Sequence, residues 1–232
     1  MKTQRGFTLI EVSIVLLIIA FTLGSIMIPL GTSLEQKAIN DTKQQIAEIK
    51  AAIINFTIAN GRMPCPDTTT GTNRDGLENN PGGICANPLG SIPHVALNIP
   101  HRQDAWGNPF IYRVTTNFAD KIAAGGAGTG CGTANANVSI AMCSVGDITV
   151  NDYDISAGAA IPAATQISGI VISTGKPSSS NSATEQDNLG NDTTFTKMGY
   201  SDRNSTMPFN DIVVWISPNE LIGHLIQAQI LP

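Results

Sequence analysis

A single carboxylate lies inside the most apolar part of the chain. Residues 7–30 contain no charged side chain other than Glu11, and this run is long enough to cross a bilayer as a helix. A carboxylate in hydrocarbon must be protonated, neutralised by a cation, or placed where it reaches the headgroup surface. Glu11 is therefore either a group that pairs with a cation or a side chain that snorkels from the start of a membrane span.

Four cysteines, Cys65, Cys85, Cys131 and Cys143, lie after residue 60. An even number in an exported domain favours disulfides, and four cysteines allow three pairings. We predict Cys65–Cys85 and Cys131–Cys143, because each pair would close one local loop. A zinc site is the alternative, but the chain has no C-x-x-C motif and only three histidines, so ligand spacing favours disulfides.

The acidic residues supply no recognisable catalytic group. The stretch GDITVNDYD contains Asp147, Asp152 and Asp154, but no base, nucleophile or phosphate-binding loop accompanies them. A lone set of carboxylates is a weak signal, so we interpret these as solvated turn acids. The chain is accordingly not expected to be an enzyme.

Residues 175–206 are rich in Ser, Asn and Thr and poor in apolar side chains, which predicts a long loop. This stretch contains the oxygen ligands that calcium needs, although their spacing matches no EF-hand. The calcium candidates are Glu185, Asp187 and Asp192, with Asn188 and Asn191 beside them. Calcium is the one cofactor considered, and no other is expected.

The composition excludes one large class of partners. The chain has 232 residues with a formal net charge of −5, and no block of Lys or Arg occurs after its start. Proteins that bind nucleic acid depend on clustered Lys and Arg to neutralise phosphates, so nucleic acid is not an expected partner. About two hundred residues after the apolar run suffice for one domain with a proper core.

The apolar run must begin a long helix. As a helix, residues 7–30 would measure about 36 Å against a hydrocarbon core of about 30 Å, which predicts a transmembrane segment. A secretory signal peptide fits poorly, because its apolar region is shorter and ends in a small-residue cleavage site. Over residues 31–60, Ile39, Ile46 and Ile53 recur every seven positions, which predicts an amphipathic continuation that stops at Asn60-Gly61. A coiled coil is the alternative, but the pattern lasts under four heptads.

Residues 61–232 read as a β-containing domain. Seven of the thirteen prolines fall between residues 64 and 109, so this part is mostly irregular loop. At the C-terminal end Ser217 is the expected N-cap of a short helix, with Pro218 at N1 and Glu220 completing a capping box. Strands are predicted from Phe110 to Val114 and at residues 137–143, 147–150, 166–173 and 211–217.

The N-terminus resembles a known family. Residues 1–6 form a short basic leader that ends in Gly6, and FTLIEV and the apolar run follow. This arrangement resembles the processing site of type IV prepilins and type II secretion pseudopilins. The resemblance implies that a prepilin peptidase and methyltransferase cuts after Gly6 and methylates the new N-terminal Phe7. It also implies that Glu11 pairs in a filament with the Phe7 amine of a neighbouring subunit.

Two weaker likenesses concern the rest of the chain. Residues 104–110, DAWGNPF, are similar to the loop that enters the sheet of major pseudopilins. Some pseudopilins also bind calcium in a loop like that of residues 175–206. The implied fold is α+β and pilin-like, with a long N-terminal helix packed on an antiparallel β-sheet, many loops and a short C-terminal helix.

The sequence thus predicts a minor pilin or pseudopilin of a type IV pilus or a type II secretion pseudopilus. Its parts would be a cleaved leader (1–6), a transmembrane assembly helix (7–30), an amphipathic continuation (31–60) and an exported domain (61–232). It would cross the inner membrane once, with the domain in the periplasm. The partners would be other subunits, the inner-membrane assembly platform and lipid. The alternative is a membrane-anchored periplasmic binding module that does not polymerise.

Overall fold

A computed structural model describes most of the chain. The described residues are 6–69, 74–120, 140, 144–154, 159–176, 183–190, 192–199 and 209–231, and the side chains of 23–30, 154, 183 and 184 lie outside the description. The chain divides into two compact units, Met1–Asp41 and Thr42–Pro232. Each unit is described by itself.

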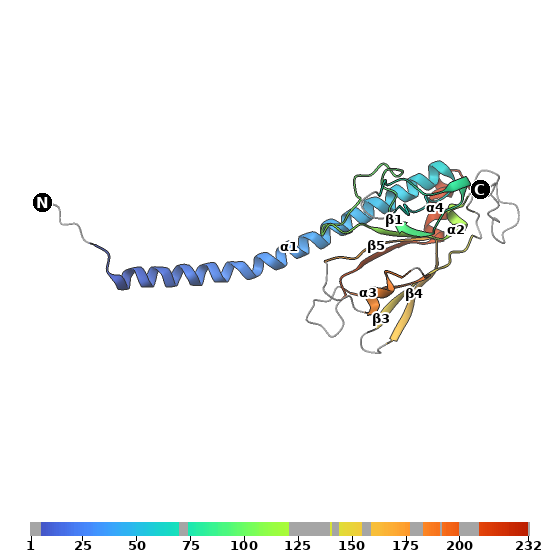
Figure 1. Cartoon of the computed structure of the whole chain (residues 1–232). Helices are drawn as coiled ribbons and strands as arrows, with labels where there is room; N and C mark the ends of the chain where they lie inside the picture. Colours follow the sequence, from blue (N-terminus) through green and yellow to red (C-terminus); the bar gives the residue numbers. More distant parts are fainter. Residues whose placement is uncertain are drawn as a thin grey trace. The chain divides into compact units, whose positions relative to one another are not determined.

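Helix α1 spans Leu9–Asn60 without a break and so runs through both units (Figure 1). The predicted stop at Asn60-Gly61 is confirmed, because Gly61 has a φ of 67° and its N–H bonds to the Thr57 carbonyl. Positive φ is the conformation that glycine tolerates at a helix end. Within the second unit, the α1 residues Ile46, Ile49 and Ile53 are fully buried, in agreement with the predicted apolar stripe.

In the part of the chain that the structure describes, no helix combines the length and the apolarity of a membrane span. Eight residues of the predicted transmembrane segment, 23–30, have side chains outside the description.

The larger sheet has four strands in the order β1-β2-β5-β7, and each pair of neighbouring strands is antiparallel. Its strands are β1 (Leu89–Ser91), β2 (Ile111–Val114), β5 (Gly169–Ser173) and β7 (Ile212–Ile216). The prediction of an α+β fold with an antiparallel sheet is confirmed. Strands β2 and β7 lie where the alternation of apolar residues predicts them.

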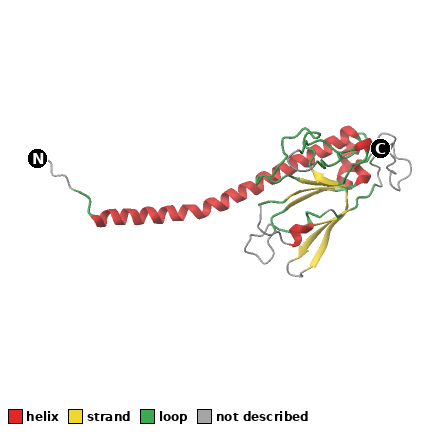
Figure 2. Cartoon of the chain, in the orientation of Figure 1, coloured by secondary structure: helices red, strands yellow, loops and turns green. Residues whose placement is uncertain are grey.

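The smaller sheet has three strands in the order β4-β3-β6. Figure 2 shows strands in yellow and helices in red. They are β3 (Ile148–Asp154), β4 (Ala159–Ile167) and β6 (Thr194–Lys197). Strand β3 pairs antiparallel with β4 and parallel with β6. One buried cluster joins the two sheets, and it contains Ile148, Val150, Ile167, Ile170, Ile172, Phe195 and Val213.

Two predictions about strands and loops need correction. Residues 166–173 are not one strand, because Ser168 separates β4 from β5 and bonds through its N–H and hydroxyl to the Ile216 carbonyl. Residues 175–206 are not one long loop, because α3 (Ala183–Asp187) and β6 lie within them. The strand predicted at 137–143 lies outside the described residues except Ile140, which is in no strand.

Three more short helices are described: η2 (Pro81–Gly83), α2 (Thr116–Ala119) and α4 (Pro218–Gln227). Helix α4 has the predicted N-cap, because the Ser217 hydroxyl accepts from the Glu220 N–H at 3.2 Å, but among the described residues no bond from the Ser217 N–H to the Glu220 carboxylate completes the predicted capping box. The Glu220 carboxylate reaches Lys50 on α1 at 2.8 Å, so an ion pair ties α4 to the first helix.

Candidate functional site

The first turn of α1 is closed by a reciprocal contact between Thr8 and Glu11. The Thr8 N–H and hydroxyl donate to Glu11 Oε2 at 3.2 and 3.1 Å, and the Glu11 N–H donates to Thr8 Oγ1 at 3.4 Å. This is a capping box, in which the N-cap and N3 side chains satisfy each other's backbone N–H groups. Among the described residues no donor reaches Glu11 Oε1, so one oxygen of the carboxylate remains available.

The capping box was readable in the sequence as T-x-x-E but was not predicted. The resemblance implies a pair between subunits, and in the structure Glu11 also has a partner within its own chain and is exposed.

Exposed apolar side chains surround the capping box and continue along the first turns of α1. Phe7 is 85% exposed, Leu9 is 89% exposed and Phe21 is 77% exposed. The other large apolar side chains exposed on this stretch are Ile10, Val12, Ile14, Val15, Leu16, Leu17, Ile18 and Ile19. Exposed apolar surface that is continuous over several turns marks a contact with a protein or a membrane.

The bond predicted to be cut lies just outside the helix. Gly6 and Phe7 are exposed and precede the first residue of α1, and nothing lies within 4 Å of the place where a Cβ on Gly6 would stand. An exposed, non-helical peptide next to a small residue is accessible to a peptidase.

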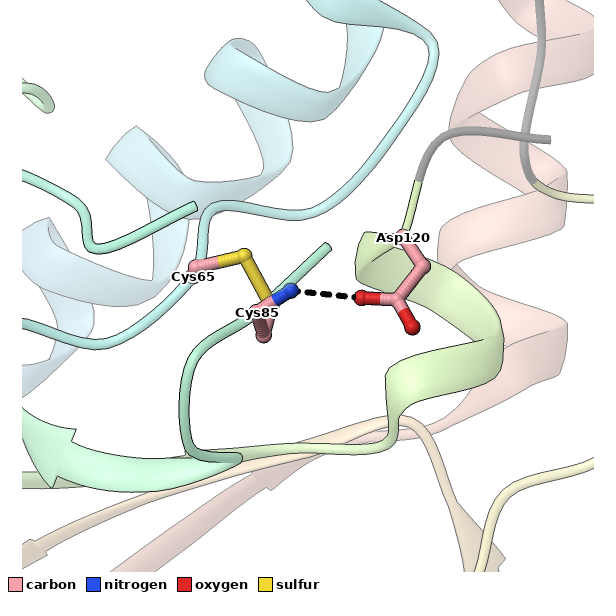
Figure 3. A group of neighbouring side chains, drawn as sticks. All are labelled: Cys65, Cys85 and Asp120. Carbon is pink, nitrogen blue, oxygen red and sulfur yellow. Dashed lines mark hydrogen bonds between the residues drawn. A yellow bond between two sulfur atoms is a disulfide. The ribbon is translucent and has the colours of Figure 1, made fainter. Parts of the chain in front are cut away.

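The predicted disulfide Cys65–Cys85 is present and closes a segment of 20 residues (Figure 3). Asp120 faces it and accepts a hydrogen bond from the Cys85 N–H at 2.8 Å. Cys65, Cys85 and Asp120 are also close enough to hold one metal ion. A metal would need the two sulfurs as thiolates, whereas here they are bonded to each other. The predicted partners Cys131 and Cys143 lie outside the described residues.

The structure does not bring the calcium candidates together. Glu185 is buried and accepts from the Asn210 N–H, Asp187 accepts from the Thr196 hydroxyl, and Asp192 accepts from the Thr194 N–H. These three carboxylates do not form a group with ligand atoms within 4.8 Å of one another. Asn191 lies outside the described residues.

A buried polar network stands beside these acids, and no sequence pattern predicted it. The fully buried Asn188 donates to Asp211 at 2.7 Å and to the Thr196 carbonyl at 2.9 Å, and it accepts from the Thr196 N–H. Burial raises the pKa of the Asp211 carboxyl to about 7, the hydrogen bond from Asn188 opposes this rise, and the nearby charge of Glu185 adds to it. Asn188 thus links α3 to β6 and to the start of β7.

Asp147, one of the acids predicted to be solvated, has hydrogen-bond partners in β2 and directly after it. Its carboxylate accepts from the Thr115 hydroxyl at 2.6 Å and from Arg113 at 3.1 Å. Asp152 is exposed on β3, and the side chain of Asp154 lies outside the description.

The comparisons with known proteins concern only the N-terminus. Residues 1–27 match the model of the prokaryotic N-terminal methylation motif. No curated protein and no solved structure matches the chain. The matched residues include Gly6, Phe7 and the Thr8–Glu11 capping box. The chain therefore carries an N-terminal signal of the type IV pilin kind.

Proposed function

We propose that this chain is a structural subunit, a minor pilin or pseudopilin, of a type IV pilus or a type II secretion pseudopilus. A prepilin peptidase would cut it after Gly6 and methylate the amine of Phe7. Its work would be architectural, with no catalytic step. The loop-rich exported domain and the absence of any cysteine after Cys143 favour a minor subunit over a major one.

The observation that carries the proposal is the methylation motif at residues 1–27, which leads directly into helix α1. A leader that is merely a targeting signal needs no capped helix behind it. Here the first helical turn is closed by residues of the motif itself, Thr8 and Glu11. The helix that the cut would expose is therefore already formed.

The geometry of Glu11 suits a contact between subunits. Oε2 is held by Thr8, while Oε1 accepts no hydrogen bond from the described residues. The amine that cleavage creates at Phe7 is a cation, and the Oε1 of a neighbouring subunit can accept it. Because both charges would be removed from water, the pair is favourable only when the two helices have one particular stagger. Glu11 would thus set the axial register of the filament.

The apolar run of residues 7–30 would serve before and after assembly. Before assembly it would anchor the chain once in the inner membrane, and after assembly it would pack against the same surface of other subunits. The disulfide Cys65–Cys85 supports export of the second unit, because disulfides persist in oxidising compartments such as the periplasm. The assembly platform of the inner membrane would then be a partner.

Sheared filaments test the proposal. Cells that express the chain together with its assembly machinery are sheared, and the filament and membrane fractions are probed with an antibody to the second unit. We expect the chain in the filament fraction, at a lower amount than the major subunit. If the major subunit is in the filaments while this chain stays entirely in the membrane fraction, the non-polymerising binding module is the correct function.

A further inference from the structure

The second unit contains a cavity of about 330 Å³ that is bordered by basic side chains. Arg74 lines it from the segment between α1 and η2, His94 and Arg102 line it from the connection between β1 and β2, and Ser91 and Gln103 add polar groups. The chain as a whole is acidic, with a formal net charge of −5. Three basic side chains around one cavity are therefore a local reversal of the charge of the molecule.

Among the described residues, these three side chains have no ionic or hydrogen-bonding partner. Four ion pairs are present among the described residues, and none of them includes Arg74, His94 or Arg102. No described residue hydrogen-bonds to the side chains of these three either. Arginines that stabilise a loop are normally paired with a carboxylate or a carbonyl, as Arg62 is with Glu78 in this chain.

The one acid that lines the cavity is already occupied. Asp67 is buried, and its carboxylate accepts from the Thr69 N–H at 2.9 Å, from the Thr69 hydroxyl and from the Gly76 N–H at 2.9 Å. These donors hold the Asp67 carboxylate within its own loop. Asp67 shapes the cavity wall and leaves the guanidinium groups of Arg74 and Arg102 to a ligand.

The loops that carry the basic residues are fixed to one another. Asp67 and Ser91 exchange two backbone hydrogen bonds of 3.0 and 2.8 Å. The Gly76 carbonyl accepts from the Val95 N–H at 2.9 Å, and a Cβ at Gly76 would lie 2.3 Å from the ring of His94. The His94 ring thus packs on the backbone of Gly76, which has a φ of 72°. A cavity held in this way is formed before any ligand enters it, which lowers the entropic cost of binding.

A second cavity of about 580 Å³ adjoins the first. Asp67, Arg74, Ser91 and Pro109 line both of them. The lining of the second cavity adds hydroxyl and amide groups from Thr68, Thr174 and Asn87 and an apolar wall from Leu89 and Ile111. The two cavities share Arg74, but His94 and Arg102 line only the first, and the groups that only the second has are neutral.

We propose that these two cavities bind a small ligand with a phosphate or carboxylate group. The anionic group lies in the first cavity, where Arg74 and Arg102 donate to its oxygens from two sides and His94 adds a ring N–H. Guanidinium groups match phosphate and carboxylate oxygens in a planar, two-pronged geometry. The body of the ligand extends past Ser91 into the second cavity. This site is separate from the N-terminal helix and does not depend on filament assembly.

Isothermal titration of the full-length chain in detergent tests the proposal. The probes are inorganic phosphate, glucuronate as a carboxylate with a polyhydroxy body, and neutral glucose, all at one ionic strength set with sodium chloride. We expect both anions to bind and glucose to give no heat. The tighter of the two anions then identifies the chemistry of the natural ligand.

Three variants locate the binding. Arg74→Gln and Arg102→Gln each remove one charged donor from the cavity, and each is expected to weaken anion binding about tenfold. Lys43→Gln removes an exposed charge of the same sign from α1 and should leave binding unchanged. Both arginines are exposed, and the thermal unfolding temperature of each variant serves as the check on folding.

The proposal is overturned if the wild-type chain binds neither anion at millimolar concentration. It is overturned equally if Lys43→Gln weakens binding as much as the two arginine substitutions do, because binding then reflects the general surface charge. If one arginine variant fails to fold, the other arginine variant and the comparison with neutral glucose still show whether the cavity binds anions.

Discussion

Thr8 and Glu11 close the first turn of α1 on each other, and both Thr8 donors bond to the same oxygen of Glu11, Oε2. The other oxygen, Oε1, accepts nothing from the described residues. One carboxylate can thus cap its own helix and still receive a cation from another subunit. The capping role needs an acceptor at residue 11, whereas the pairing role needs a negative charge there.

Two substitutions separate the capping role of Glu11 from its proposed pairing role. Glu11→Gln keeps an oxygen that can accept from Thr8, because Gln also completes a capping box, but it removes the charge. Glu11→Val removes both. We expect both variants to be absent from sheared filaments, because pairing with the Phe7 amine requires the charge. Filaments that incorporate Glu11→Gln normally would show that only the cap matters.

Thr8→Ala is the matched control for the cap. It removes the hydroxyl that bonds to Glu11 and leaves the charge in place, at a cost of about 1 kcal/mol in helix stability. We expect filaments to incorporate this variant at a reduced level, since the pair with Phe7 still forms. Complete loss of incorporation, equal to that of Glu11→Val, would contradict the separation of the two roles.

The disulfide Cys65–Cys85 is expected to stabilise the second unit by about 3 kcal/mol, because it closes a segment of 20 residues in the unfolded chain. The Cys65→Ser, Cys85→Ser double variant should lose this free energy of unfolding, as measured by denaturant titration. Zinc added to the oxidised wild-type chain should not change the unfolding midpoint, because the sulfurs that would bind it are bonded to each other. A rise in the midpoint with zinc would favour the metal site.

Asp211 predicts a pH dependence of stability. Its pKa in the folded chain is about 7, against an ordinary value of 3.8, because the carboxyl is buried. Between these two values the folded chain keeps a proton that the unfolded chain releases. The free energy of unfolding therefore falls as the pH rises from about 4 to about 7, by about 1.4 kcal/mol per pH unit from this group, and then levels off.

Asp211→Asn isolates this contribution. The amide oxygen can still accept from Asn188, while the ionisable group is gone, so the variant should be the more stable chain at pH 8 and should lack this slope. Asp152→Asn, an exposed acid on β3, is the control and should keep the wild-type slope. Identical slopes for Asp211→Asn and the wild-type chain would show that Asp211 is ionised throughout.

Ser217 predicts a measurable cap at the start of α4. Its hydroxyl accepts from the Glu220 N–H at 3.2 Å, so Ser217→Ala should lower the free energy of unfolding by about 1 kcal/mol. Ser217→Gly, which is tolerated at an N-cap, should cost only a few tenths of this amount. Glu220→Gln should also cost less than Ser217→Ala, because the ion pair with Lys50 is partly exposed. Equal losses for the alanine and glycine variants would mean that the hydroxyl does not cap the helix.

The elements that were predicted correctly are those that a few neighbouring residues specify. Helix α4 follows from Ser217, Pro218 and Glu220, and the end of α1 follows from Asn60-Gly61. Strands β2 and β7 follow from alternating apolar residues. Strand β4, AAIPAATQI, was missed because Pro162 reads as a breaker and nearly all of its side chains are exposed. Strand β6 was missed because its four residues contain one large apolar side chain, the buried Phe195.

The candidate sites also differ in whether their residues lie close together in the sequence. Gly6, Phe7 and Glu11 could be named because their spacing lies within a few residues of sequence. Asn188 and Asp211 are 23 residues apart, and only the packing of α3 against the sheets brings them together. Arg74 comes from a different loop than His94 and Arg102, and the arrangement of the two loops depends on Gly76 and on backbone pairing between Asp67 and Ser91. No residue pattern along the chain encodes such a cluster.

Mass spectrometry of the N-terminus shows directly whether the chain is cut after Gly6 and methylated at Phe7. The chain is purified from cells that contain an active prepilin peptidase, digested, and searched for its N-terminal peptide. We expect a chain that begins at Phe7, with a methyl group on its amine and residues 1–6 absent. An intact leader beginning at Met1 in those cells would contradict the proposal that the chain is a processed pilin or pseudopilin.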